Sequence, residues 1–132
     1  MPASELPPVS GEIVFEDDEF CKSLRHHQNC KIVVQLEDVT AADTSSKMIT
    51  RQTIERLDFP HHGSSNRNKP FTIPFELFFE IRDKQRRYAI SVDADMDGDG
   101  KVSSGDYINM QSYPVITQGY PTHISVKVGR IE

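Results

Sequence analysis

The chain has 132 residues, of which 36% are hydrophobic and 27% are charged, and this size and composition are typical of a single globular domain with a sizeable core. Its formal net charge of −5 argues against a nucleic-acid-binding surface. No apolar run is long enough to cross a membrane as a helix. We therefore expect one domain that binds neither nucleic acid nor the membrane interior.

The first residues differ in composition from the rest of the chain. Residues 1–10, MPASELPPVS, are predicted to form a flexible N-terminal arm, and residues 11–132 the domain. The arm lacks the basic start and apolar core of a secretory signal. If Met1 is the native start, we expect a cytoplasmic protein. If a leader was removed, we expect a secreted or envelope protein.

From Gly11 onward, apolar residues recur with a period of two, which predicts β-strands rather than helices. The alternation is clearest in five segments, 13–15, 32–36, 71–77, 88–92 and 124–128, and weaker in 47–57 and 107–115. About seven strands separated by turn-rich segments predict an all-β fold, an antiparallel β-sandwich. Pro74 cannot donate a hydrogen bond to a ladder, so we expect its strand at a sheet edge.

Both cysteines of the chain, Cys21 and Cys30, lie in the first long connection. A disulfide between them would close this loop and stabilise the protein mainly by restricting the unfolded chain. Two free thiols are the alternative. Structural zinc sites usually pair ligands two to four residues apart, so the wider spacing here disfavours a zinc site with the neighbouring histidines.

Two further polar segments are interpreted as solvent-exposed. His61 and His62 lie in a connection without nearby partner ligands, and residues 82–87 form a basic cluster before a predicted strand. The basic cluster could alternatively meet an acidic partner. The sequence has no nucleophile elbow and no His-Glu-x-x-His motif. We therefore expect a protein that is not an enzyme.

Residues 95–106 have the side-chain pattern of a calcium-binding loop between the fifth and sixth predicted strands. Counted from the first aspartate, oxygen-bearing side chains stand at positions 1, 3, 5, 9 and 12, namely Asp95, Asp97, Asp99, Ser103 and Asp106. A glycine at position 6 permits the sharp turn of such loops, and Lys101 at position 7 would contribute its carbonyl oxygen. These six residues are the predicted Ca²⁺ ligands.

A solvated acidic turn is the alternative, because Asp-Gly pairs mark turns in many proteins. Four closely spaced aspartates repel one another unless something neutralises them, which favours the calcium site. The aspartate at position 12 is shorter than the bidentate glutamate usual in EF-hands, so we expect weaker binding.

The long connections are expected to lie at one end of the fold. In an up-and-down order, the first, third and fifth connections leave the same end of the strands. These contain residues 21–30, residues 61–62 and residues 95–106. Because binding function is often placed on long loops, we expect this end to be the functional face.

Five segments along the chain occur in an order that resembles a known family. They read VQLEDVTAAD (34–43), RQTI (51–54), IPFEL (73–77), RRYAI (86–90) and YPVIT (113–117). Together they are similar to the YbaY/YscW-type lipoproteins, a group that includes type III secretion pilotins. The resemblance covers residues 11–131. It implies a small β-sandwich without catalytic machinery, some of whose members help an outer-membrane secretin to assemble.

Two functions follow from these observations. The first is a calcium-binding, non-catalytic β-sandwich whose ion orders a long loop and whose partner is another protein. The alternative, implied by the resemblance, is a pilotin-like chaperone that assists assembly of a secretion or envelope complex. An enzyme that uses the metal as a Lewis acid is the least favoured, because the cage would fill its own coordination sites.

Overall fold

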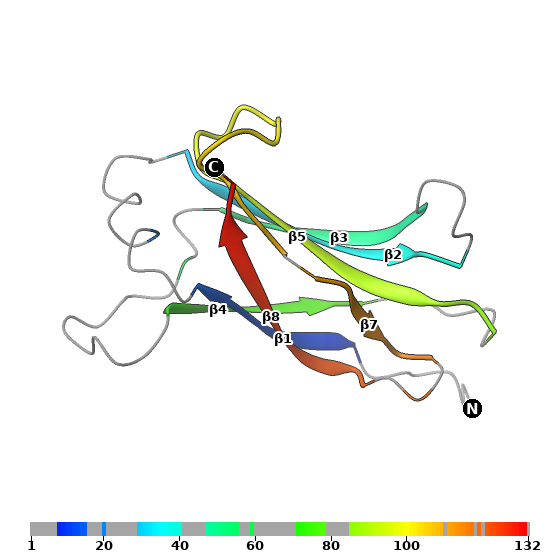
Figure 1. Cartoon of the computed structure of the whole chain (residues 1–132). Helices are drawn as coiled ribbons and strands as arrows, with labels where there is room; N and C mark the ends of the chain where they lie inside the picture. Colours follow the sequence, from blue (N-terminus) through cyan, green and yellow to red (C-terminus); the bar gives the residue numbers. More distant parts are fainter. Residues whose placement is uncertain are drawn as a thin grey trace.

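The computed structural model describes residues 8–15, 20, 29–40, 47–55, 59, 71–78, 85–109, 111–117, 119 and 121–131. Eight strands make up its elements (Figure 1): β1 (Val9–Phe15), β2 (Lys31–Asp38), β3 (Lys47–Glu55), β4 (Phe71–Leu77), β5 (Tyr88–Asp95), β6 (Tyr107–Asn109), β7 (Tyr113–Val115) and β8 (His123–Arg130). The all-β prediction is confirmed. β1 begins at Val9, two residues before the predicted start of the domain.

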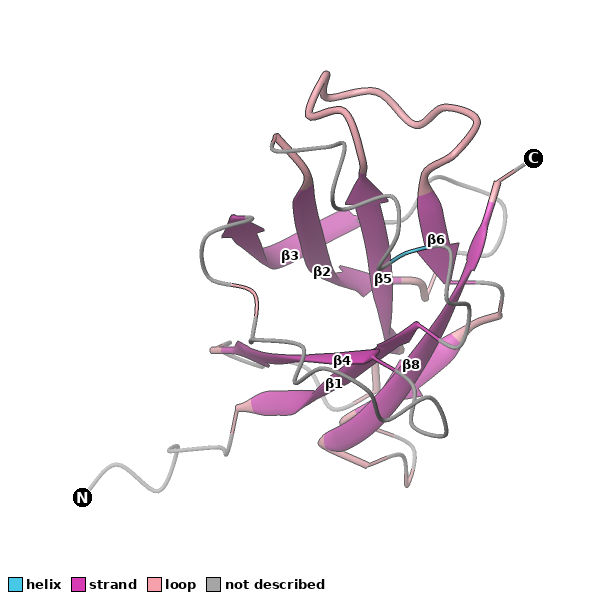
Figure 2. Cartoon of the chain, turned by 90° about the vertical axis from the view of Figure 1, so that its left-hand side faces the viewer, coloured by secondary structure: helices cyan, strands magenta, loops and turns pink. Residues whose placement is uncertain are grey.

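The strands form one continuous sheet, in the order β3-β2-β5-β6-β8-β1-β4, with β7 also paired to β5. The sheet curls on itself, as Figure 2 shows, and a hydrogen bond links its two terminal strands, β3 and β4. The backbone N–H of Glu76 donates a hydrogen bond to Oε1 of Gln52 across this seam, at 3.0 Å. The two faces of the predicted sandwich are therefore parts of one nearly closed, barrel-like sheet.

One strand pair departs from the predicted antiparallel arrangement, since β1 and β8 are parallel. The reason is strand parity. β6 and β7 both run antiparallel to β5 and so count as one pass of the chain. The chain then makes seven passes, and its first and last passes run in the same direction. Where these two strands meet, they can only pair in parallel.

The predicted strand over residues 107–115 is wrong as a single element, because the structure divides it into β6 and β7. Ile108 is opposite Asp93 and Tyr113 is opposite Ile90, so four residues on one side face two on the other. The backbone N–H of Val92 donates instead to Oδ1 of Asn109, at 3.0 Å. The Asn109 side chain thus takes the place of a backbone carbonyl where the surplus residues interrupt the hydrogen bonds between the strands.

The interior is filled by the apolar side chains that alternate along the strands. Ile32, Val34 and Leu36 of β2 are fully buried, as their spacing predicts. The rings of Phe15 and Phe20 stack with centroids 3.6 Å apart, and the ring of Tyr107 meets that of Phe15 edge-on at 5.5 Å. This single core extends along β5, from Tyr88 at its start to Ala94 near its end.

The terminal strands of the sheet have the features expected of edges. Pro74 lies in β4, which ends the strand order, so its predicted edge position is confirmed. β3 ends the order on the other side, and Ile54 is its buried apolar residue. In the part of the chain that is described, no helix could span a membrane.

Candidate functional site

The acidic segment lies at one end of the barrel, between β5 and β6, as predicted. Figure 1 shows it as the yellow loop that extends beyond the sheet. Gly100, at position 6 of the predicted calcium loop, has a left-handed φ of 81°, and Gly98 has a φ of 70°. Glycine adopts such angles without steric cost. The loop therefore makes the sharp turn that its sequence predicts.

The structure brings together three of the six predicted ligands. Asp95, Asp97 and Asp99 each offer a carboxylate oxygen, and these oxygens all lie within 4.8 Å of one another. Asp97 and Asp99 are exposed, whereas only 5% of Asp95 is accessible. Oδ2 of Asp95 accepts a hydrogen bond from the N–H of Gly100 at 2.7 Å. Its Oδ1 is buried and has no hydrogen-bond partner among the described residues.

The crowding of these carboxylates changes their pKa values. Burial, helped by the neighbouring negative charges of Asp106, Asp95 and Asp99, raises the pKa of Asp93 to about 6. Burial also raises the pKa of Asp95, despite the hydrogen bond from Gly100. The pKa of Asp97 is lowered, chiefly by its interaction with the side chain of Asp95. The excess negative charge at this end is therefore costly to hold without a proton or a cation.

Asp106, the predicted ligand at position 12, accepts hydrogen bonds from the loop backbone. It is 1% exposed, and its Oδ1 and Oδ2 accept hydrogen bonds from the backbone N–H groups of Met96 and Ser103, both at 2.9 Å. It thus ties the start of the loop to its end and is not part of the carboxylate cluster. Lys101 is exposed, and its N–H donates to Oδ1 of Asp99 at 2.8 Å.

The first long connection meets the acidic loop at the same end of the barrel. A Cβ on Gly98 would collide with the carbonyl oxygen of Asn29, and Sγ of buried Cys30 donates to Sδ of Met96 at 3.7 Å. The shared end predicted for these two connections is confirmed. Cys21 and the pair at 61–62 lie outside the described residues, so the Cys21–Cys30 disulfide stays a prediction.

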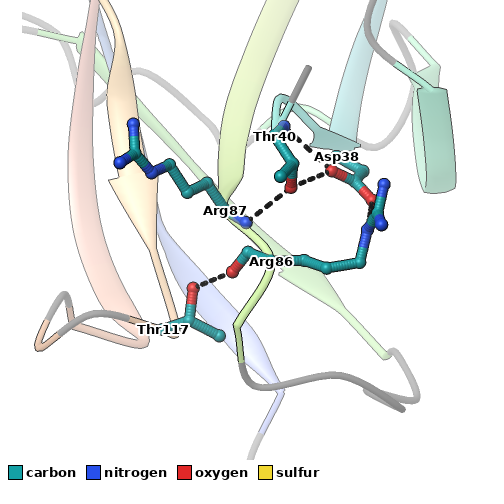
Figure 3. Close-up of polar contacts among 5 residues, drawn as sticks. All are labelled: Asp38, Thr40, Arg86, Arg87 and Thr117. Atoms are coloured by element: carbon teal, nitrogen blue, oxygen red, sulfur yellow. Dashed lines mark hydrogen bonds and ion pairs between the residues drawn. The ribbon is translucent and has the colours of Figure 1, made fainter. Parts of the chain in front are cut away.

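A second polar cluster, which we call the Asp38 cluster, lies at the opposite end of β2 and β5 (Figure 3). Asp38 accepts hydrogen bonds from the N–H of Thr40 at 3.0 Å and from its hydroxyl at 2.6 Å, and it forms an ion pair with Nε of Arg86. The Thr40 hydroxyl accepts from the N–H of Arg87 at 2.8 Å, and the hydroxyl of Thr117 donates to the carbonyl of Arg86 at 2.6 Å.

The Asp38 cluster shows what sequence reasoning missed. The sequence predicts that Arg86 and Arg87 belong to a solvated basic turn, but Arg86 is half-exposed and neutralises a buried carboxylate of its own chain. The sequence Asp-Val-Thr at the end of a strand is a local signal for a side chain that bonds the backbone two residues on. Nothing local indicates that Arg86 pairs with it.

Exposed apolar side chains mark the seam between the terminal strands. Met48 and Ile49 on β3 are exposed, as is Phe78, which follows β4 and is 70% accessible. A further exposed residue, Val102, lies on the acidic loop. Sequence reasoning did not predict the exposure of Met48 and Ile49, because an apolar residue in a strand is ordinarily assigned to the core.

Two solved structures are similar to the chain in fold. One is an alternative pilotin from the type II secretion system of Vibrio cholerae, 20% identical with a TM-score of 0.63, and the match covers 95% of this chain and 96% of that one. The other is a fimbrial assembly protein from Parabacteroides distasonis ATCC 8503, 12% identical with a TM-score of 0.53, covering 93% of this chain and 53% of that one. No curated protein matches the sequence.

The chain matches one protein-family model over nearly the whole domain. The model of the type III secretion system lipoprotein chaperones, YscW, matches residues 7–128. This range includes the acidic loop and all but the last two residues of β8. The resemblance expected from the order of the five segments is confirmed. The chain belongs to the YscW family of type III secretion system lipoprotein chaperones.

Proposed function

We propose that this protein is a pilotin-like chaperone that binds a segment of an envelope secretion component, such as a secretin, and assists its assembly. The observation that carries the proposal is the match of the YscW family model to residues 7–128, because that family is described as lipoprotein chaperones of a secretion system. The same description supports an envelope location and a function in binding rather than catalysis. It favours the pilotin-like chaperone over a function centred on calcium binding.

The outer edge of β3 is suited to such a segment. β3 ends the sheet order and pairs with β2 on its inner side. An edge strand presents N–H and C=O groups to which an extended peptide can add as a further strand. The exposed side chains of Met48 and Ile49 lie on this strand, and Phe78 follows the facing strand β4. Apolar residues beside an open edge suit a partner with alternating apolar side chains.

The link between β3 and β4 is compatible with this mode of binding. A side chain, that of Gln52, bonds the backbone of Glu76. An incoming strand beside β3 would displace this hydrogen bond instead of a paired strand. The net contribution of one such bond is about 0.5–1.5 kcal/mol, which the burial of two or three apolar side chains would offset.

A titration with secretin segments tests the proposal. Peptides that cover the C-terminal segments of secretins encoded in the same genome are titrated into the protein. We expect one of them to bind, and Ile49→Asp and Phe78→Asp to weaken it at least about tenfold, because a charge would be buried at the interface. Failure of every peptide, and of the full-length secretins on co-expression, would contradict the proposed function.

Val102→Asp is the matched control. Val102 is 60% exposed and lies on the acidic loop. Met48 pairs with Glu37 near one end of β2, whereas Asp95 pairs with Lys31 at the other. The control therefore adds the same charge at the far end of the barrel, and we expect it to leave the affinity unchanged. An equal loss in Val102→Asp would exclude β3 as the binding edge.

A further inference from the structure

We propose that the loop between β5 and β6 binds one Ca²⁺ ion through the carboxylates of Asp95, Asp97 and Asp99. Their clustered oxygens lie within 4.8 Å of one another. Calcium–oxygen bonds are 2.3–2.6 Å long, so two oxygens on one ion are separated by at most about 5 Å. The three oxygens therefore already fit the coordination sphere of a single calcium ion.

The buried carboxylate of Asp95 is the second observation that indicates a ligand. Asp95 is 5% exposed, and its Oδ1 has no hydrogen-bond partner among the described residues. A buried acceptor without a partner costs the desolvation of that group, and the cost is greater for a charged one. The other oxygen, Oδ2, already accepts a hydrogen bond from the N–H of Gly100 at 2.7 Å. A cation bound there would supply the missing partner.

The loop holds the cluster in place without help from an ion. The N–H of Asp99 donates to Oδ1 of Asp97 at 3.3 Å, and the carboxylate of Asp106 ties the two ends of the loop together through Met96 and Ser103. Because these bonds fix the backbone beforehand, little ordering would remain for the ion to impose. Asp106 is thus a brace of the site, and we assign the metal-binding role to the other three carboxylates.

The number of oxygen ligands that the loop can offer favours calcium over magnesium. Calcium takes six to eight oxygens in an adaptable arrangement, whereas magnesium requires a near-ideal octahedron and keeps several waters. Three carboxylates on alternate residues leave room for further oxygens. The carbonyl of Lys101 and the hydroxyl of Ser103, both on the same loop, are the groups predicted from the sequence pattern to complete the sphere, with water.

The ion would act on the end of the barrel opposite the proposed peptide-binding edge. The acidic loop contacts Asn29 and Cys30 at the start of β2, while Met48 and Ile49 lie near the other end of that strand. A bound Ca²⁺ would therefore lie in the loop that contacts the segment before β2. This inference does not depend on the proposed chaperone function, because the two sites share no residue.

Calorimetric titration of chelator-treated protein with CaCl₂ tests the site. We expect one ion per chain. The variants Asp97→Asn and Asp99→Asn should each bind at least tenfold more weakly, since each loses a charged ligand. Both side chains are exposed, so the variants should fold, and circular dichroism without calcium verifies this. No binding at millimolar calcium, or equal affinity in Asp97→Asn, would overturn the proposal.

Glu55→Gln is the matched control, because it removes one negative charge at the same end of the sheet. Glu55 is exposed and pairs with Lys31, which is also opposite Asp95. Non-specific attraction of cations would weaken in this variant as much as in Asp97→Asn, and that outcome would overturn the site. The titration repeated in tenfold excess MgCl₂ should retain calcium binding, whereas displacement by magnesium would overturn the assignment to calcium.

Discussion

Asp38 is a carboxylate that stays charged although it is almost wholly buried. Burial by itself raises its pKa, but the hydrogen bonds from the Thr40 hydroxyl and N–H and the contact with Arg86 outweigh this effect. Its pKa consequently lies below the ordinary value of 3.8. The folded protein therefore stabilises the carboxylate form of Asp38 more than water does, and this difference adds to the free energy of unfolding.

The first prediction concerns the substitution Asp38→Asn. It removes the ion pair with Arg86, and we expect the free energy of unfolding at pH 7 to fall by about 1–2 kcal/mol, a value reduced because Arg86 is half-exposed to solvent. Since the folded pKa of Asp38 is depressed, its contribution is complete well above pH 3.8 and is lost as the pH falls through the folded value. Urea denaturation between pH 7 and pH 3 measures both effects.

Glu76→Gln serves as the control for this prediction. The side chain of Glu76 is exposed, and its backbone makes the hydrogen bond to Gln52. We expect its stability to follow that of the wild type at every pH. A difference between Asp38→Asn and wild type that stays constant down to pH 3 would show that the Asp38 charge does not stabilise the fold.

At the scale of elements, the interruption between β6 and β7 is what distinguishes this sheet from a regular ladder. Asn109, the last residue of β6, bonds both β5 and the connection to β7, because its Oδ1 accepts from the N–H of Val92 and its Nδ2 donates to the carbonyl of Gln111 at 2.9 Å. A buried N–H without a partner costs about 1–3 kcal/mol. The asparagine side chain therefore offsets the cost of the surplus residues, because it provides an acceptor for the N–H of Val92.

The second prediction is that Asn109→Ala destabilises the protein by about 1–3 kcal/mol, because the amide of Val92 loses its acceptor. Amide hydrogen exchange at Val92 should accelerate more than exchange in β2. Asn109→Asp keeps the acceptor oxygen and loses the donor to Gln111, so Val92 should remain protected there. Similar protection of Val92 in wild type and Asn109→Ala would contradict this account.

At the scale of the whole molecule, local patterns and long-range pairings were predictable to different degrees. The alternation in residues 32–36 correctly identified a buried strand, and the glycine spacing identified the turn at Gly100. Both signals depend only on residues that are close together in the sequence. The curling of the sheet, the ion pair between Asp38 and Arg86 and the bracing role of Asp106 depend on residues brought together by pairing. No period along the chain encodes these contacts.

The third prediction follows from the proposed calcium site. An ion that binds only the folded chain at a hundred times its Kd raises the free energy of unfolding by about 2.7 kcal/mol, which corresponds to roughly 10 °C in Tm for a domain of this size. Scanning calorimetry with calcium and with EDTA measures this shift. Asp97→Asn should show no shift. Identical melting curves of the wild type in both solutions would contradict the prediction.

The parallel pairing of β1 with β8 has a consequence for the order in which the molecule can form. In the strand order, β8 is the link between β6 on one side and β1 on the other. Without it, the sheet divides into a β3-β2-β5-β6 part, with β7 attached, and a β1-β4 pair. During synthesis, β1 leaves the ribosome before the other strands, but it cannot pair with its second neighbour, β8, until β8 has been made. Loop closure over such a separation is slow. Until β8 has emerged, the nascent chain can therefore form at most two incomplete sheets with open edges.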